Sequence, residues 1–398
     1  MSGPLHRIRI LDLTSVLMGP SATQILGDMD ADIIKIESLS GDTTRKIGPS
    51  RSPNMGSNFL NMNRNKRSLV LDLKHPKSHS VLMRLVKQCD VLIHNIRPQA
   101  AQKLGLSYET ISAANPRMIY CALTGFGSQG PYSGLPAYDD LIQGLAALPS
   151  LYAQCGDQPR YVPTPIVDRT AGLYAVIAVT SALLHRHNTG HGQYVEVPMF
   201  ESMAHVVLAD HLYGQTFSPP LGPAGYTRML SPKRHPYPTT DGWICVLIYN
   251  DKQWNSFFDV IGKPHLKEDP RFTSMQSRNK HIDHVYGLVA DQLKQESTAY
   301  WIDKLSAAQI PAGPMNSLET LIQDSHLKSV GFIESSKHPT EGDIQNLKIP
   351  ITWSDSPASM KHPAPNLGEH SKQILKEYEF TDEEIGQLLN EGVITHKE

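Results

Sequence analysis

Residues 8–20 read IRILDLTSVLMGP, and this segment decides the fold class. Its first six residues, Ile8–Leu13, form a mainly apolar run that predicts a strand buried within a sheet. The Gly19-Pro20 pair predicts a helix that continues to about Met29, because proline is well suited to the first turn of a helix. A buried strand followed at once by a helix is the first half of a βαβ unit.

The same alternation continues through the first two hundred residues. Further buried strands are predicted at residues 33–36, 69–73, 91–94, 118–124 and 194–197. Helices are predicted at residues 76–87, 108–114, 138–148 and 170–187. Because strands that alternate with helices are joined by parallel crossovers, the sequence predicts an α/β fold with a large doubly wound, Rossmann-like domain.

Two irregular, proline-rich stretches interrupt this pattern. The first, residues 201–230, is rich in proline and glycine and predicts a linker. Residues 237–323 predict a smaller α+β unit. The second irregular stretch spans residues 337–366, and two short polar helices are predicted after it, at 371–378 and 382–389. A chain of 398 residues is too long for one hydrophobic core, which favours at least two packed units.

The composition is that of an ordinary globular protein without a strong charge. The net charge of −2 offers no electrostatic basis for binding nucleic acid. The four cysteines form no CxxC pair and are spaced too widely for a zinc ribbon, so we interpret them as reduced thiols. No signal peptide is found before Ile8, and no apolar stretch approaches the roughly 20 residues that cross a bilayer. We therefore expect a cytoplasmic protein with no nucleic-acid partner and no membrane partner.

One glycine motif is rejected because of its context. Gly125, Gly127 and Gly130 spell GxGxxG after a predicted strand. A dinucleotide site requires a helix to begin at these glycines, but Pro131 and the Gly134-Leu135-Pro136 run prevent it. A mobile glycine loop beside an active site is the interpretation that we favour.

A histidine cluster is also set aside. His185, His187 and His191 lie close together, yet no carboxylate or thiolate accompanies them. They are interpreted as a solvated helix end, where cations are favoured. No metal site is predicted.

Polar residues follow or flank several predicted strands, and open α/β sheets bind ligands at the carboxyl ends of their strands. Asp168 stands just before the predicted helix 170–187 and is a candidate N-cap residue. Backbone N–H groups at a helix start would also keep this carboxylate ionised at neutral pH, so a structural and a chemical role are compatible.

Cations that could together bind a phosphorylated ligand are Arg64, Lys66, Arg67, Lys74, Arg97 and Lys103.

Short motifs follow one another along nearly the whole chain. They are Ile10–Thr14 with Gly19-Pro20, Asp32–Glu37 with Gly41-Asp42, Asn65–Ser68 with Leu71–Lys74, Asp90–Asn95, Tyr138-Asp139 with Gln143, Thr189–Gln193 with Val195–Val197, Ile310–Pro314 and Pro365–His370. In this order they resemble the class III CoA-transferases, a family that includes formyl-CoA transferase and carnitine CoA-transferase. Each motif alone is weak, but the ordered set is specific.

The resemblance implies that Asp168 is the catalytic aspartate and that acyl-CoA and a carboxylic acid are the substrates. No tightly bound cofactor is implied, and coenzyme A acts as a substrate. The residues that the resemblance places in contact with CoA are Val16, Leu71, Asp72, Leu73, Lys74, Asn95, Ile96, Arg97, Lys103, Pro136, Ala137, Tyr138 and Asp139.

The same resemblance implies an interlocked, ring-shaped homodimer. In such proteins the large domain combines the N-terminal half of the chain with its C-terminal tail. The expected division is a large CoA-binding domain over residues 1–200 with 335–398, a linker over 201–230 and a small α+β domain over 231–334.

Some positions depart from formyl-CoA transferase. Ser38 stands where that enzyme has an arginine at the adenine end of CoA, and Leu17 stands where it has an active-site glutamine. Its run of consecutive glycines is missing after Leu230. Formate–oxalate exchange is therefore not expected. A larger or less polar acyl group, such as a dicarboxylate or a branched acid, fits better.

The implied reaction passes through a mixed anhydride and then a CoA thioester on Asp168. The loop over residues 125–130 would supply N–H donors to the oxyanions and exclude water. One alternative is an acyl-CoA racemase, which pairs this aspartate with a histidine. Here Tyr138 stands at that position, and tyrosine is a poor base at neutral pH. A second alternative is an inactive CoA-binding protein, against which the intact Asp168 argues.

Overall fold

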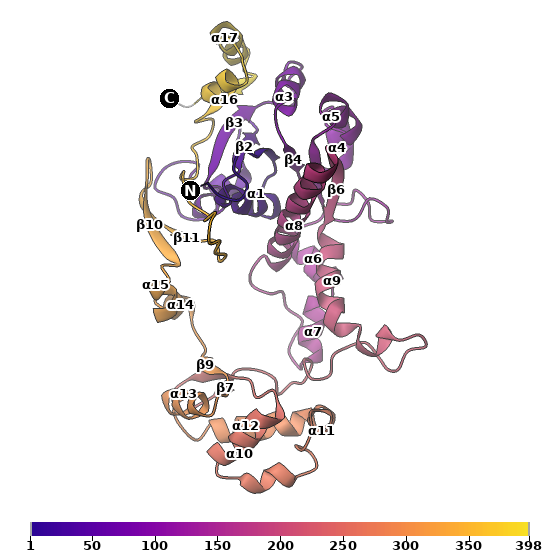
Figure 1. Cartoon of the computed structure of the whole chain (residues 1–398), viewed down its shortest axis with the longest axis vertical. Coiled ribbons are helices and arrows are strands. Elements are labelled where there is room, and N and C mark those ends of the chain that lie inside the picture. Colours follow the sequence, from indigo (N-terminus) through magenta and orange to yellow (C-terminus); the bar gives the residue numbers. More distant parts are fainter. Residues whose placement is uncertain (1, 397–398) are drawn as a thin grey trace. The chain divides into compact units, whose positions relative to one another are not determined.

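The computed structural model describes residues 2–396, which divide into two compact units (Figure 1). The first unit contains the chain up to residue 146, residues 163–205 and the segment from 326 onward. The second unit contains residues 147–162 and 206–325. Each unit has a hydrophobic core of its own.

A seven-stranded sheet organises the first unit. Its strands are β1 (Arg9–Leu13), β2 (Asp32–Glu37), β3 (Lys66–Leu71), β4 (Val91–His94), β5 (Ile119–Thr124), β6 (Gln193–Pro198) and β12 (Ile394–Thr395). Their order is β12-β3-β2-β1-β4-β5-β6, and only β12 runs antiparallel to its neighbour. The order β3-β2-β1-β4-β5-β6 is that of a doubly wound sheet, with a switch point between β1 and β4. The predicted α/β fold with a mostly parallel sheet is confirmed.

Helices bury the two faces of this sheet. Leu11, Ile34 and Leu69 share a core with the helices α3 (Ser78–Val86), α5 (Tyr108–Ala114), α16 (Ser371–Glu377) and α17 (Asp382–Asn390). The alternate strand residues Ile10 and Ile33 are also fully buried, as expected for a sheet covered on both sides. Helices α1 (Met18–Asp28) and α8 (Ile166–Thr189) pack on each other and on the strands. Shorter helices of this unit are α2 (Ser57–Leu60), α4 (Pro98–Lys103) and α6 (Asp139–Leu145).

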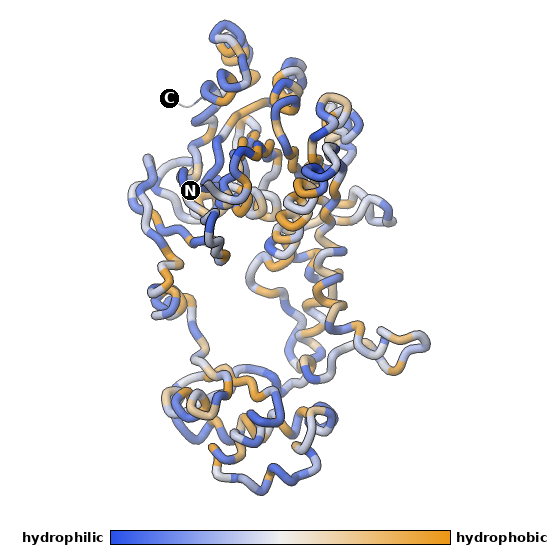
Figure 2. Tube along the Cα trace, viewed as in Figure 1, coloured by the Kyte–Doolittle hydropathy of each residue, from blue (hydrophilic) through white to orange (hydrophobic). Residues whose placement is uncertain are grey.

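Helix α8 is long and apolar enough to cross a membrane by length and composition alone. The expectation that no apolar stretch approaches this length is therefore wrong. Apolar residues alternate with hydrophilic ones along this helix (Figure 2). Val167, Ala171, Ala175 and Val179 are completely buried against the rest of the unit. We interpret α8 as a core helix, because these four residues form an apolar face that is buried inside the protein.

Two stretches predicted to be irregular contain regular structure. Residues 199–211 form α9 (Met199–His211), because Met203 and Val207 lie one helical turn apart and are buried. The region 337–366 contains most of a hairpin of β10 (Ile333–His338) and β11 (Gly342–Leu347). The single helix predicted at 138–148 is instead α6 followed by α7 (Leu148–Gln154). Ala147 separates the two helices with a left-handed φ of 68°.

The interior of the first unit contains ion pairs as well as apolar side chains. Both members of each of three pairs are at most 1% exposed. These pairs are Asp12 with Lys66 at 3.2 Å, Asp42 with Lys35 at 3.0 Å and Glu37 with Arg45 at 2.6 Å. Charges buried this deeply are tolerated only when they are paired and hydrogen-bonded, so the three pairs constrain how β1, β2 and β3 align.

Asp12 is the most connected of these charges. Its carboxylate accepts hydrogen bonds from Lys66 Nζ, from Thr23 Oγ1 at 2.6 Å and from the Thr14 backbone N–H at 2.9 Å. Burial alone would raise the pKa of Asp12, but the positive charges of Lys66 and Lys35 and the hydroxyl donors outweigh it and hold the pKa at about 2. The carboxylate is therefore ionised throughout the neutral range.

The C-terminal segment completes this unit. Ile374, Leu375 and Tyr378 are at most 1% exposed and belong to the same core as the first strands. The Gly368 N–H donates to Ser68 Oγ, and the Asp72 N–H donates to the Val393 carbonyl. Strand β12 then pairs with β3 at the sheet edge.

The second unit is a small α+β body. Strands β7 (Tyr237–Pro238), β8 (Trp243–Val246) and β9 (Ala312–Pro314) form an antiparallel sheet. Its core gathers aromatic side chains, including Trp254, Phe257 and Trp301. The helices of this unit are α7, α10 (Asp251–Val260), α11 (Met275–Lys280), α12 (Ile282–Leu293), α13 (Thr298–Ala307) and α14 (Leu318–Ile322).

We predict that Asp12→Ala destabilises the protein by about 3–5 kcal/mol, because it leaves Lys66 buried without a counter-charge. Urea unfolding followed by circular dichroism measures this change. Lys77→Ala is the control, because Lys77 forms an exposed pair with Glu391 and its loss should cost less than about 1 kcal/mol. Equal losses for the two variants would contradict the assignment.

Candidate active site

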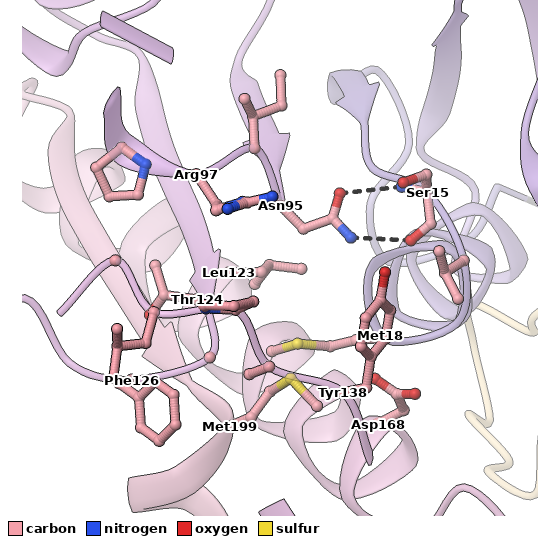
Figure 3. A pocket seen from close by; sticks show the side chains of 18 of the residues that line it. Ser15, Met18, Asn95, Arg97, Leu123, Thr124, Phe126, Tyr138, Asp168 and Met199 are labelled. Atoms are coloured by element: carbon pink, nitrogen blue, oxygen red, sulfur yellow. Dashed lines mark hydrogen bonds between the residues drawn. The ribbon is translucent and has the colours of Figure 1, made fainter. Parts of the chain in front are cut away.

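The pocket that contains Asp168 lies at the switch point of the large sheet. Its walls are the loops that follow β1, β4 and β5, and its volume is about 230 Å³ (Figure 3). Ligands of open α/β sheets bind at this place, where loops from neighbouring strands diverge. The lining residues are Ser15–Met18, Asn95–Pro98, Leu123–Phe126, Ser133–Tyr138, Asp168, Glu196 and Met199.

Two of these loops are joined by one side chain. Asn95 Nδ2 donates to the Ser15 carbonyl at 2.9 Å, and Asn95 Oδ1 accepts from the Ser15 N–H at 3.1 Å. Figure 3 shows both bonds across the pocket. The next residue, Val16, has a φ of 71°, which is unfavourable for a β-branched side chain. Its N–H donates to Asp42 Oδ1 at 3.3 Å, so a buried carboxylate holds this strained turn.

Asp168 lies in the first turn of α8, which begins at Ile166. It is therefore not the N-cap, because the helix starts a turn earlier than predicted. The backbone N–H groups of Val167 and Asp168 both donate to Asp139 Oδ2, at 2.9 Å each. Asp139 thus occupies the donors at the start of this helix, although it is distant in sequence.

This arrangement changes the expected acidity of Asp168. Burial raises the pKa of Asp168, and the nearby negative charge of Asp139 raises it further, to about 7; Arg169 opposes both effects. The helix start therefore does not keep the pKa of this carboxylate low: burial and the charge of Asp139 raise it, and Asp139 takes the N–H donors that would have lowered it. A carboxylate with a raised pKa is a stronger nucleophile once it is ionised.

The glycine loop after β5 is held by two glutamates. The Gly127 N–H donates to Glu201 Oε1 at 2.9 Å, and the Ser128 N–H donates to Glu196 Oε1 at 3.1 Å. A side chain at Gly125 would lie 2.3 Å from Ala137 Cβ, so the close approach requires glycine. No helix begins at these glycines, as predicted. Two of the N–H groups expected to bind an oxyanion are already occupied by carboxylates.

Comparison with known proteins identifies the family. The family model described as CoA-transferase family III matches residues 5–371. The chain belongs to CoA-transferase family III. It is therefore an enzyme that transfers coenzyme A from an acyl-CoA to a carboxylic acid.

Individual relatives agree with this assignment. The chain is 32% identical to the succinate–glutarate CoA-transferase of Agrobacterium fabrum, over 94% of this chain and 96% of the relative. It is 30% identical to human succinyl-CoA:glutarate CoA-transferase, over 99% and 91%. Among solved structures, a CAIB/BAIF family protein from Brucella suis matches with a TM-score of 0.79 and 30% identity, covering 95% of this chain and all of that one.

Some of the residues expected to contact CoA line the pocket of this CoA-transferase. They are Val16, Asn95, Ile96, Arg97, Pro136, Ala137 and Tyr138, together with the catalytic candidate Asp168. Asp139, the first residue of α6, does not line the pocket but accepts from the N–H groups at the start of α8. The others lie beyond this cavity: Leu71 is buried in the core, Asp72 and Leu73 are half-buried, and Lys74 and Lys103 are exposed.

Three of the six candidate cations are structural. Lys66 pairs with Asp12, Arg64 pairs with Asp28 at 2.6 Å, and Arg67 bonds Asp32 and Glu377 at 2.7 Å each. The hypothesis that Lys66 and Arg64 bind a phosphorylated ligand is wrong, because both are buried against their carboxylate partners; Arg67 is likewise already paired. Arg97 lines the pocket.

Sequence reasoning missed Glu196 and Met199, which line the pocket, and Glu201 beside it. Glu196 is an acidic residue within the apolar run Tyr194–Val197, and that interruption was the available signal. Among the described residues, no group of three or more His, Cys, Asp or Glu side chains could hold a metal ion.

The raised pKa of Asp168 predicts the pH dependence of the transferase. Because a protonated carboxyl cannot attack a thioester, kcat/KM should fall as the pH drops through about 7. Asp139→Asn removes the neighbouring charge but keeps an oxygen that can accept from the α8 N–H groups, so the acid limb should move to lower pH. Steady-state kinetics from pH 5 to 9 test this.

Asp140→Asn is the control for that experiment, because Asp140 is exposed and adjacent to Asp139. It should leave the acid limb where it is. An acid limb that stays in place or moves upward in Asp139→Asn would contradict the proposed electrostatic effect.

Proposed function

We propose that this enzyme exchanges coenzyme A between short dicarboxylic acids, with Asp168 as the group that becomes acylated. The observation that carries the proposal is the placement of Asp168, partly desolvated and beside a second carboxylate, in a pocket at the switch point of the sheet. A group with this perturbed acidity in a ligand pocket is a candidate catalytic residue.

The first half of the reaction moves the donor acyl group to the enzyme. The ionised Asp168 oxygen attacks the thioester carbonyl, the carbon–sulfur bond breaks, and CoA thiolate leaves. The thiolate then attacks the Asp168 carboxyl carbon of the mixed anhydride. The donor acid leaves as its carboxylate, and an aspartyl-CoA thioester remains.

The second half repeats these steps in reverse with the acceptor acid. The acceptor carboxylate attacks the aspartyl thioester and releases thiolate, which then attacks the acceptor carbonyl of the new anhydride. Acceptor acyl-CoA leaves and Asp168 is again a free carboxylate. No net proton is consumed, so a single ionised carboxylate suffices.

The proposed substrate class draws on relatives and on the pocket. The relatives named above act on succinate and glutarate. The pocket combines apolar side chains, including Leu17, Met18 and Leu123, with the cation Arg97. Apolar walls suit the methylene groups of a dicarboxylate, and a cation suits its carboxylate or a phosphate of CoA.

The racemase alternative has less support. It requires a second base that faces Asp168, and histidine is absent from the described residues that line this pocket. Tyr138 lines it and is 73% exposed. If a 2-methylacyl-CoA exchanged its α-proton with D₂O on this enzyme, the racemase would be favoured instead.

Asp168→Ala should lower CoA transfer by at least about a thousandfold, because it removes the covalent route. The assay supplies succinyl-CoA with a panel of acids that includes glutarate, acetate and a branched acid, and it measures the new thioester. Intact-protein mass spectra of the unsubstituted enzyme should show an acyl or CoA adduct.

Asp140→Ala, at the exposed neighbouring carboxylate, should transfer CoA at close to the normal rate. Transfer at full speed by Asp168→Ala would refute the nucleophile. Transfer only to the branched acid would refute the substrate class.

We also propose that the enzyme acts as an interlocked homodimer. Support comes from the family resemblance and from an apolar stripe on α8. Leu173, Ile177 and Leu184 are 55%, 59% and 62% exposed, and their spacing places them on one helix face. A second copy of the chain would remove this stripe from water.

Size-exclusion chromatography with light scattering should report a dimer for the unsubstituted protein. Ile177→Lys with Leu184→Lys should shift the mass toward the monomer. His187→Lys, at an exposed polar position of the same helix, should leave the dimer intact. A monomeric unsubstituted protein, or a double variant that stays dimeric, would contradict the α8 contact.

A further inference from the structure

His94 ends strand β4, directly before the pocket residues Asn95, Ile96 and Arg97. It does not line the pocket and is only 3% exposed. A buried histidine needs partners for its ring nitrogens, and those partners determine which nitrogen carries the proton. The hydrogen bonds around His94 therefore define its role.

The hydrogen bonds of the Tyr120 hydroxyl determine which nitrogen of His94 carries the proton. The Tyr120 hydroxyl lies 2.8 Å from His94 Nε2 and 2.6 Å from the Leu106 carbonyl oxygen. A carbonyl oxygen can only accept, so the single hydroxyl hydrogen is donated to Leu106. Tyr120 Oη must then accept from His94, which places the imidazole proton on Nε2.

The opposite nitrogen is consequently an acceptor. His94 Nδ1 lies 3.2 Å from the backbone nitrogen of Ile96 and accepts its N–H. This bond closes a tight turn around Asn95, whose side chain is bonded to Ser15 on the facing loop. The chain of bonds from Leu106 through Tyr120 and His94 to Ile96 thus ends at the wall of the pocket.

Burial lowers the pKa of His94 to about 4. The ring is therefore neutral at physiological pH. A protonated ring would carry a hydrogen on Nδ1 as well, and that hydrogen would face the Ile96 N–H. The turn therefore requires the neutral ring.

We propose that His94 is a positioning residue for the CoA substrate, in that its Nδ1 atom fixes the 95–97 turn against which the acyl-CoA binds. The inference rests on the proposed function, since it requires that CoA occupy this pocket. His94 touches no reacting atom. Its loss should weaken CoA binding and leave the chemical step largely unchanged.

Two substitutions distinguish the roles of the two ring nitrogens. In His94→Asn, the amide oxygen takes the place of Nδ1 and can still accept from the Ile96 N–H, but the contact with Tyr120 is lost. In His94→Gln, the longer amide reaches Tyr120, but no acceptor remains beside the Ile96 N–H. Both variants lose the buried ring, so they should lose similar thermal stability.

CoA binding is measured by calorimetry in the Asp168→Ala background, where no covalent turnover occurs. His94→Gln should bind CoA about five- to tenfold more weakly, since one hydrogen bond is worth roughly 1 kcal/mol. His94→Asn should stay within about twofold of the parent. With Asp168 intact, His94→Gln should raise KM for acyl-CoA by the same factor and change kcat by less than about twofold.

Tyr120→Phe provides a second route if His94→Gln does not fold. It removes the acceptor that holds the proton on Nε2, so it should also weaken CoA binding while both nitrogens of His94 remain. Equal affinities for the Gln and Asn variants, or an unchanged affinity in either His94→Gln or Tyr120→Phe, would overturn the inference.

Failure of the proposed function can be distinguished from failure of the His94 inference. Normal CoA binding combined with full activity of Asp168→Ala would refute the catalytic role of Asp168 and leave the role of His94 intact. Failure of the unsubstituted protein to bind CoA would refute both.

Discussion

The burial of the Asp12 carboxylate is the constraint on which the rest of the first unit depends. An ionised carboxylate without contact to water must be surrounded by donors, and here Lys66, Thr23 and the Thr14 N–H supply them. Those donors come from β3, α1 and the end of β1, so satisfying one charge aligns three elements. Lys35 extends the network, because its Nζ donates to the Thr14 carbonyl and to Asp42. Asp42 in turn holds the strained Val16 at the pocket wall.

Asp168 in the pocket lacks the stabilisation that an aspartate in the first turn of a helix usually has. An aspartate in the first turn of a helix is ordinarily stabilised as an anion by free N–H groups. In this enzyme Asp139 accepts from those groups, and Asp168 is left partly buried beside a like charge. Such a departure from local consistency is expected at a functional site, which agrees with the role proposed for Asp168.

Much of the fold could be predicted from pattern because apolar runs report burial directly. Strands β1 to β6 were found from such runs, and a sheet with both faces covered leaves little ambiguity. Charges were harder to interpret, because a sequence shows a charge without its partner. Lys66 and Arg64 resemble ligand-binding cations in the sequence, but in the fold they pair with Asp12 and Asp28. The acidity of Asp168 depends on Asp139, and no local pattern at residue 168 contains that information.

The return of the C-terminal segment to the first unit has a consequence for how the protein is made. Strand β3 meets β12, and Ile374, Leu375 and Tyr378 enter the core of the first strands, only after the long intervening part of the chain has been synthesised. Until then the nascent N-terminal half exposes apolar surface and an open strand edge, both of which favour aggregation. The second unit is contained within residues 147–325 and has no such delay. The order of synthesis therefore completes the sheet and core of the first unit later than those of the second unit.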